Sequence, residues 1–172
     1  MNFLLRLFGP NDVGIDLGGA NVRVWMRGEG LVLEEPVGDG SFKAGVVPDF
    51  DTAKKLFRYC FSKTDGCRLR RRRVVIAVRI GITEEEKRIL EDAARAAGAR
   101  EVFLLESPMA AAIGAGLPVS EPKGCMIVEI GASMTSAAVI SFAEIVHSKT
   151  LRVGGDAMNN AIMEYMRTKH NY

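Results

Sequence analysis

A short pattern occurs twice in the chain and constrains its fold more than any other feature. When "GIDLGGANVRVWM" (residues 14–26) is set under "VEIGASMTSAAVI" (residues 128–140) so that Gly18 falls on Gly131, Asp16 falls on Glu129. In both copies an acidic residue ends an apolar strand, small residues form a turn, and a second strand follows. A further short strand after each hairpin would complete a three-stranded meander. The repeat therefore predicts two related lobes.

The residues between the two hairpins alternate between strand signals and helix signals. Val74–Val78 is a continuous apolar run, which is typical of a strand buried on both faces of a sheet. Thr83 and Glu86 form a capping box, and the helix that they open ends at Gly98. The remaining expected elements are a helix capped by Asp49 or Asp51, a strand over Glu101–Leu105, a helix capped by Ser107, a strand over Ile145–Val153 and a last helix after Gly154 with Met158, Ala161, Ile162 and Tyr165 on one face.

This order of elements predicts an α/β fold. It reads β-β-β-α-β-α-β-α and then β-β-β-α, which implies a mixed sheet flanked by helices and the beginning of a second, similar sheet. The chain has 172 residues, of which 48% are hydrophobic and 26% charged, so it is globular and not disordered. "GLPVSEPKG" (residues 116–124) is the expected linker.

Charge and cysteine content exclude several classes of protein. The net charge of +2 comes from 23 basic and 21 acidic residues, so we expect no nucleic-acid partner. Cys60, Cys67 and Cys125 have the spacing of neither a disulfide framework nor a zinc site, which favours a reducing cytoplasm.

Two segments have alternative interpretations that the residues alone leave open. The first eight residues carry Phe3, Leu4, Leu5, Leu7 and Phe8 around a single arginine. They are either a frayed terminus or an amphipathic anchor lying in a membrane interface. The run "RLRRRR" (residues 68–73) is either a solvated loop or a contact for anionic lipid or an acidic partner.

The turns of the repeated hairpins are the candidate binding sites. A strand that ends in an acid before a small-residue turn can offer backbone N–H groups to a phosphate while the carboxylate holds a hydrated Mg²⁺. A plain tight hairpin has the same residues, but the repeat favours the phosphate interpretation. The second turn is poorer, because Met134 adds bulk where a phosphate needs bare backbone. The candidate phosphate-binding residues are Asp16, Gly18, Gly19, Asn21, Glu129, Gly131 and Thr135, with Asp16 as a weak Mg²⁺ ligand.

Three stretches of the chain resemble the MreB/Mbl family of bacterial actins. They are residues 11–36, which include "GIDLGGANVRVW", residues 72–122, which include "LLESPMAAAIGAG", and residues 150–172, which include "VGGDAMNNAI". The resemblance implies an actin-like ATPase fold of the ribonuclease H-like kind. Subdomain IA would cover residues 11–116, and the start of subdomain IIA residues 124–172. The resemblance also implies ATP and Mg²⁺ as cofactors, and it favours a membrane anchor over residues 1–8 because many members carry one.

The chain departs from the family pattern at several functional positions. Residues 37–48 stand where the family inserts subdomain IB, so we expect a loop there. Ser107 occupies the position of the glutamate that positions the attacking water in the family, while Glu106 matches its upstream neighbour. Gly19 replaces a threonine of the first phosphate loop, and the second loop retains only Gly131 and Thr135. We therefore expect no catalytic residue, no ATP hydrolysis, and at most weak binding of ATP and Mg²⁺.

These features predict a cytoskeletal or scaffold protein linked to cell shape and cell-wall morphogenesis. We expect it to form a homo-oligomer or to pair with an MreB-like partner, peripherally at the cytoplasmic face of the cell membrane. The helix opened by Thr83 lies at a lateral filament contact in the family, although its charges also fit an ordinary solvated face. One alternative function is a regulator that binds or caps full-length MreB filaments. Another is an active ATPase or a sugar-kinase-like phosphotransferase.

Overall fold

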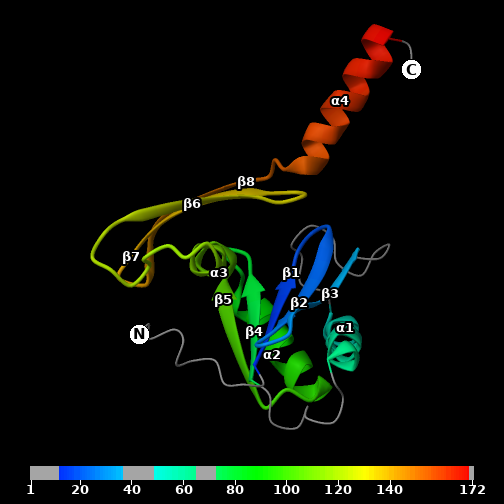
Figure 1. Cartoon of the computed structure of the whole chain (residues 1–172). Helices are drawn as coiled ribbons and strands as arrows, with labels where there is room; N and C mark the ends of the chain where they lie inside the picture. Colours follow the sequence, from blue (N-terminus) through cyan, green and yellow to red (C-terminus); the bar gives the residue numbers. More distant parts are fainter. Residues whose placement is uncertain (1–11, 37–48, 65–72, 171–172) are drawn as a thin grey trace. The chain divides into compact units, whose positions relative to one another are not determined.

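The computed structural model describes residues 12–36, 49–64 and 73–170 of the chain. The chain divides into two compact units, residues 1–107 and residues 108–172, and each unit is described by itself. The elements follow one another in the order that the sequence predicts (Figure 1). The expected N-terminal anchor, the loop at residues 37–48 and residues 68–72 of the arginine run lie outside the described residues.

The first unit is built on a five-stranded sheet. Its strands are β1 (Val13–Leu17), β2 (Asn21–Met26), β3 (Gly30–Pro36), β4 (Arg73–Val78) and β5 (Glu101–Glu106). They lie in the order β3-β2-β1-β4-β5, with β1 in the middle. The β1–β2 and β2–β3 pairs are antiparallel, whereas the β1–β4 and β4–β5 pairs are parallel. The predicted mixed sheet is confirmed.

Two helices, α1 (Phe50–Lys63) and α2 (Glu84–Ala97), pack against each other and the sheet. Of the two caps that the sequence left open for α1, the structure uses Asp49, whose Oδ1 accepts hydrogen bonds from the backbone N–H groups of residues 51 and 52 at 3.1 Å. The capping box of α2 is confirmed, because the Thr83 hydroxyl accepts from the Glu86 N–H and the Glu86 carboxylate accepts from the Thr83 N–H. Gly98 ends α2 with a φ of 121°, a conformation that favours glycine.

Alternate residues of the strands form the core together with one face of each helix. Phe57 of α1 and Ile76 of β4 are fully buried, and burying a side chain of this size stabilises the fold by about 1.5–3 kcal/mol. The expectation that β4 is buried on both faces is wrong, because Val75 is only partly buried. Apolar character alone does not show whether a second layer covers a strand.

Burial also raises the pKa of the Cys60 thiol to about 12, so this thiol stays protonated.

An ion pair with a buried carboxylate joins the residue before β1 to the start of β4. Asp12, immediately before β1, is only 4% exposed. Its carboxylate oxygens accept hydrogen bonds from Nη2 and Nε of Arg73 at 2.8 and 3.2 Å. Arg73 is the last arginine of the basic run and the first residue of β4, so at this position the run has a structural role.

The second unit contains a three-stranded antiparallel sheet, with one helix before it and one after it in the chain. Its elements are α3 (Ser107–Gly114), β6 (Cys125–Ile130), β7 (Thr135–Ser141), β8 (Glu144–Leu151) and α4 (Gly155–His170), and the strand order is β6-β7-β8. The structure differs from the prediction at the ends of α3 and β8. Ser107 is the first helical residue of α3 and not the residue before it, and β8 ends before Val153.

Two features of this unit are not apparent from its sequence. The β7–β8 turn consists of Phe142 and Ala143, which both have positive φ (53° and 61°) although neither is glycine. The N–H groups of these two residues donate to the carbonyls of Glu121 and Val119, which hold the turn. No residue of α4 is buried, so the apolar face expected there is exposed. Among the described residues, no helix is long and apolar enough to cross a membrane.

Candidate phosphate-binding hairpins

The β1–β2 turn is tight, and its sequence explains why. Asp16 is the second-last residue of β1, and the chain reverses through Gly18, Gly19 and Ala20 before β2 begins. A Cβ on Gly18 would lie 2.7 Å from the backbone oxygen of Asn21, so only glycine fits at this position. The structure therefore brings four predicted residues together at one turn: Asp16, Gly18, Gly19 and Asn21.

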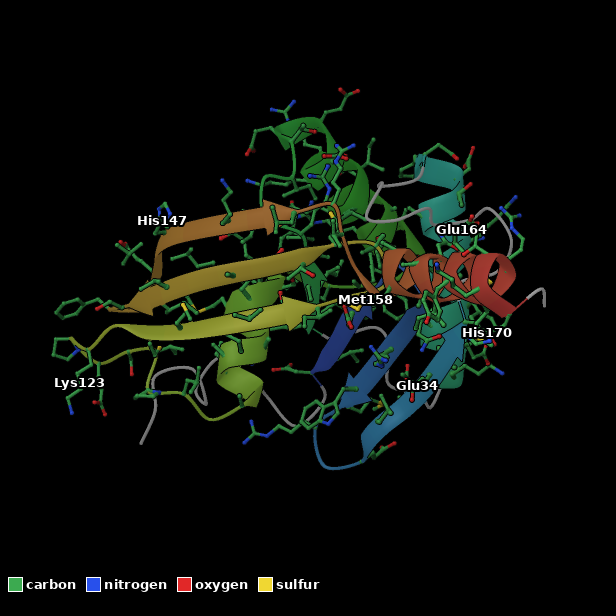
Figure 2. The ribbon with its side chains drawn as sticks, turned by 90° about the horizontal axis from the view of Figure 1, so that it is seen from above. Glu34, Lys123, His147, Met158, Glu164 and His170 are labelled. Atoms are coloured by element: carbon green, nitrogen blue, oxygen red, sulfur yellow. The ribbon has the colours of Figure 1, made fainter. Side chains whose placement is uncertain are left out.

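Two charged residues that the sequence analysis missed complete this site. In the register of the sheet Asp16 lies opposite Arg23 of β2, and Arg23 lies opposite Glu34 of β3. Nε of Arg23 donates to the Glu34 carboxylate at 2.8 Å, and Nη1 reaches Oδ2 of Asp16 at 3.5 Å. Figure 2 shows Glu34 on β3. The strand alternation contained this signal, because residues opposite one another in a register share a face.

The electrostatics of Asp16 reflect both burial and this neighbour. Although 46% of its side chain is exposed, the loss of water around the carboxylate raises the pKa of Asp16. The positive charge of Arg23 opposes that rise. The pKa of Arg23 is itself raised, chiefly by its hydrogen bond to Glu34. The positive charge of Arg23 thus supplies part of the stabilisation of the ionised Asp16 carboxylate.

The donor set of this turn does not fit a divalent metal well. Mg²⁺ in phosphate sites is usually held by one or two carboxylates together with phosphate oxygens and water. Asp16 supplies one carboxylate at the turn, but the guanidinium of Arg23 lies 3.5 Å from it, and this positive charge would repel a divalent cation. Within the described ranges no three His, Cys, Asp or Glu residues form a group that could hold a metal ion.

The polar groups of the second hairpin are engaged in bonds within its own unit. The Gly131 N–H donates to the Met134 carbonyl at 2.8 Å, and the Thr135 hydroxyl donates to the Val153 carbonyl at 2.7 Å. Glu129 lies within β6, opposite Ser136. Phosphate binding by Glu129, Gly131 and Thr135 stays a prediction, and any ligand would compete with these bonds.

This turn also supports the start of α4. The carbonyls of Gly131 and Ala132 accept hydrogen bonds from the N–H groups of Gly155 and Asp156 at 2.9 and 2.8 Å. Gly154 makes this close approach possible, because its Cβ would lie 2.5 Å from the Gly131 oxygen. The turn therefore holds the first turn of a helix, where four N–H groups otherwise lack intrahelical partners.

Glu106, the neighbour of Ser107, does not share a sheet face with Asp16. Glu106 lies opposite Val78 in the β4–β5 register, whereas the row of Asp16 and Ala77 continues to Leu105. Glu106 is thus on the other face of the sheet, where it lines a hollow of about 370 Å³ between α2 and β5. His147 and His170 are exposed side chains on β8 and α4 (Figure 2).

The charges of α2 are paired within the first unit. Lys87 contacts Glu84 at 2.6 Å, and Arg95 contacts Glu91 at 2.9 Å along the helix. Arg79 holds Glu86 with two contacts of 2.8 Å. Pairs at these spacings are typical of a solvated helix face, although they leave a lateral contact in an assembly open.

Comparison with known proteins decides the family. The sequence model described as MreB/Mbl protein matches residues 41–172. The chain belongs to the MreB/Mbl family. The cell shape-determining protein MreB of Escherichia coli (strain K12) is 38% identical to it over 196 residues, covering 93% of the chain and 56% of the relative. Mbl of Bacillus subtilis (strain 168) is 32% identical, covering 92% of the chain and 57% of the relative.

A solved MreB structure shows the same fold. MreB5 of Spiroplasma citri, crystallised with bound ADP, superposes with a TM-score of 0.82 at 29% identity, covering 93% of this chain and 57% of that one. The expected actin-like fold is confirmed. The chain spans about half the length of the curated relatives it matches. The alignment with the E. coli protein, at 196 positions, is longer than the 172 residues of the chain, so that MreB has residues in this region without a counterpart here.

Proposed function

We propose that the chain is a cell-shape scaffold of the MreB type that self-associates in the cytoplasm without hydrolysing ATP. Membership of the MreB/Mbl family and the cell-shape role in its relatives' names support the scaffold function. The residue at position 107 carries the second part of the proposal. Ser107 precedes the "PMAAA" run, where the family resemblance expects a carboxylate. A neutral hydroxyl is a poor general base for orienting and deprotonating water near pH 7.

Phosphate release and sedimentation test this function together. With Mg²⁺·ATP, we expect the purified chain to release phosphate no faster than a matched Asp16→Asn variant. We also expect the fraction that pellets at high speed to rise with protein concentration. Phosphate release that is faster than in buffer alone, and that is abolished in the Asp16→Asn variant, would show that the chain is a working ATPase. A protein that remains a monomer at tens of micromolar by light scattering would contradict self-association.

A second candidate, a regulator that caps filaments of a full-length MreB, is favoured by the surface of α4. This helix buries no residue, and several large apolar side chains are exposed on it. Exposed apolar surface of this kind marks a site of association. The residues are Met158, Ile162, Met163, Tyr165 and Met166. The chain would be added to a full-length MreB at a few per cent of its concentration. If the chain caps filaments, the pelleted fraction of that MreB should fall. If it copolymerises, the chain should itself pellet in proportion to the amount added.

We also propose that the chain lies peripherally at the inner face of the membrane through residues 1–8, whose five bulky apolar side chains support an interfacial anchor. Vesicles rich in phosphatidylglycerol should carry the intact chain into the pellet. A variant with Leu4→Asp and Leu7→Asp should remain in the supernatant, because charged side chains cannot be buried among acyl chains. Equal pelleting of the two proteins would contradict the anchor.

A further inference from the structure

Three charged side chains form a row across the first three strands of the five-stranded sheet. Asp16 of β1, Arg23 of β2 and Glu34 of β3 are successive partners in the register. Each of the three is close to half exposed, at 46%, 46% and 45%. The row begins next to the tight β1–β2 turn, and its central member is the cation.

The contacts within the row show which residue positions which. The short contact, at 2.8 Å, joins Arg23 to Glu34, whereas the contact from Arg23 to Asp16 is 3.5 Å. A length near 2.8 Å is typical of a strong charge-assisted hydrogen bond. Glu34 therefore anchors the guanidinium, and the guanidinium extends toward Asp16. Glu34 is a positioning residue, because it acts on Asp16 only through Arg23.

The spacing of the strands explains why this arrangement excludes a shared metal. Asp16 and Glu34 lie on strands that are two apart, a backbone separation of roughly 10 Å. The two carboxylates contact different nitrogens of one guanidinium, at 2.8 and 3.5 Å. A small octahedral ion, whose metal–oxygen distances are about 2.1 Å, could bind both only if Arg23 were absent and the carboxylates moved closer together. An arginine on the strand between them is long enough to contact both. The Arg23 guanidinium thus provides a positive charge beside Asp16, in the position that a divalent cation would otherwise take.

We propose that Arg23 replaces the divalent cation at Asp16, and that the β1–β2 turn binds a phosphate group without a metal. Gly18 and Gly19 have no side chains that could keep a phosphate group away from the backbone of the turn. The contacts to Glu34 and Asp16 use Nε and Nη1 of Arg23, so a half-exposed guanidinium has further N–H donors for phosphate oxygens. Arginine is well suited to this role, because its planar donors match phosphate geometry.

This inference concerns the candidate phosphate-binding turn of the proposed MreB-type scaffold, but its test does not require assembly. Self-association is measured by sedimentation without ligand, and phosphate binding by titration below the concentration at which the protein pellets. A chain that does not self-associate can therefore still bind phosphate, and a chain that self-associates can fail to bind phosphate. The two measurements distinguish these outcomes. Trp25, the single tryptophan of the chain, lies two residues from Arg23 on the same strand and reports binding by fluorescence.

The test is a titration of the whole chain with ATP, tripolyphosphate and inorganic phosphate, each in EDTA and in Mg²⁺. ATP and tripolyphosphate should bind with dissociation constants that differ by less than about threefold between the two buffers. Weaker binding of tripolyphosphate than of ATP would assign part of the affinity to the nucleoside. Binding of inorganic phosphate alone would identify a free anion as the ligand. A requirement for Mg²⁺, or no binding of any probe at millimolar concentration, would overturn the proposal.

Matched variants separate Arg23 from a general effect of charge. Arg23→Leu should weaken binding in EDTA by tenfold or more, and Mn²⁺, followed by its paramagnetic resonance, should now bind near Asp16. Glu34→Gln should give an intermediate loss, because it weakens the anchor of the guanidinium but keeps the cation. Arg27→Leu removes the same charge at the other end of β2 and should leave binding unchanged. Equal effects of Arg23→Leu and Arg27→Leu would overturn the role of Arg23.

Discussion

Replacing Arg73 with methionine is expected to destabilise the first unit by about 3 kcal/mol, because it leaves the buried Asp12 carboxylate without its cation. Methionine keeps much of the side-chain volume, so the loss reports charge more than packing. A domain of ordinary stability has only about 5–15 kcal/mol in total, so this change removes a large part of it. Urea unfolding followed by the fluorescence of Trp25, which lies in this unit, measures the effect.

Two further variants show whether the buried charge is the cause. Asp12→Asn in the Arg73→Met background should restore part of the stability, because it removes the carboxylate charge and keeps its shape. Glu84→Ala breaks a contact of 2.6 Å on the exposed face of α2 and should give no measurable change. If Arg73→Met and Glu84→Ala had similar effects, the Asp12–Arg73 pair would not be important for stability.

Gly154→Ala is expected to destabilise the second unit by about 2–4 kcal/mol, from overpacking and the loss of two hydrogen bonds. A Cβ at this position would lie 2.5–2.7 Å from backbone atoms of Gly131 and Ala132, which cannot move like the end of a side chain. To relieve this clash, α4 must move away from the β6–β7 turn. Hydrogen exchange at the Asp156 amide and the helical signal in circular dichroism both measure that displacement.

The neighbouring glycine provides the control for this prediction. A Cβ on Gly155 would lie 3.8 Å from its nearest neighbour, which is ordinary van der Waals contact. Gly155 is also the first residue of α4, where alanine has the better helix propensity. Gly155→Ala should therefore leave stability unchanged or slightly raised. A loss as large as that of Gly154→Ala would contradict the role assigned to close packing at residue 154.

The order of elements could be predicted because its signals are local. The capping box at Thr83, the glycine at position 98 and the alternation within each hairpin all involve residues that are neighbours in the chain. The repeat of the acidic hairpin added the relation between the two lobes. Together these signals gave every element of the described fold in the right order, with errors confined to element ends such as Ser107.

Parts of the fold and of the candidate site could not be predicted, because they depend on contacts between distant residues or on a turn without its usual glycine. Asp12 and Arg73 are 61 positions apart, and no local rule pairs them. The Arg23–Glu34 contact depends on a register that shifts at a bulge between Val24 and Trp25, so counting along the strands alone does not give it reliably. The left-handed turn at Phe142 and Ala143 lacks the glycine that usually marks such a turn.

The central position of β1 in its sheet also has a consequence for how the chain folds during synthesis. β1 pairs with β2 as soon as the hairpin has been made, but its other edge pairs with β4, which follows only after the whole of α1. Such distant parallel pairing forms slowly, because a long loop must close before the contacts are gained. A nascent chain that has reached α1 therefore presents an unpaired, apolar strand edge to its surroundings. Chaperone binding should be strongest in this interval and should fall once β4 has left the ribosome.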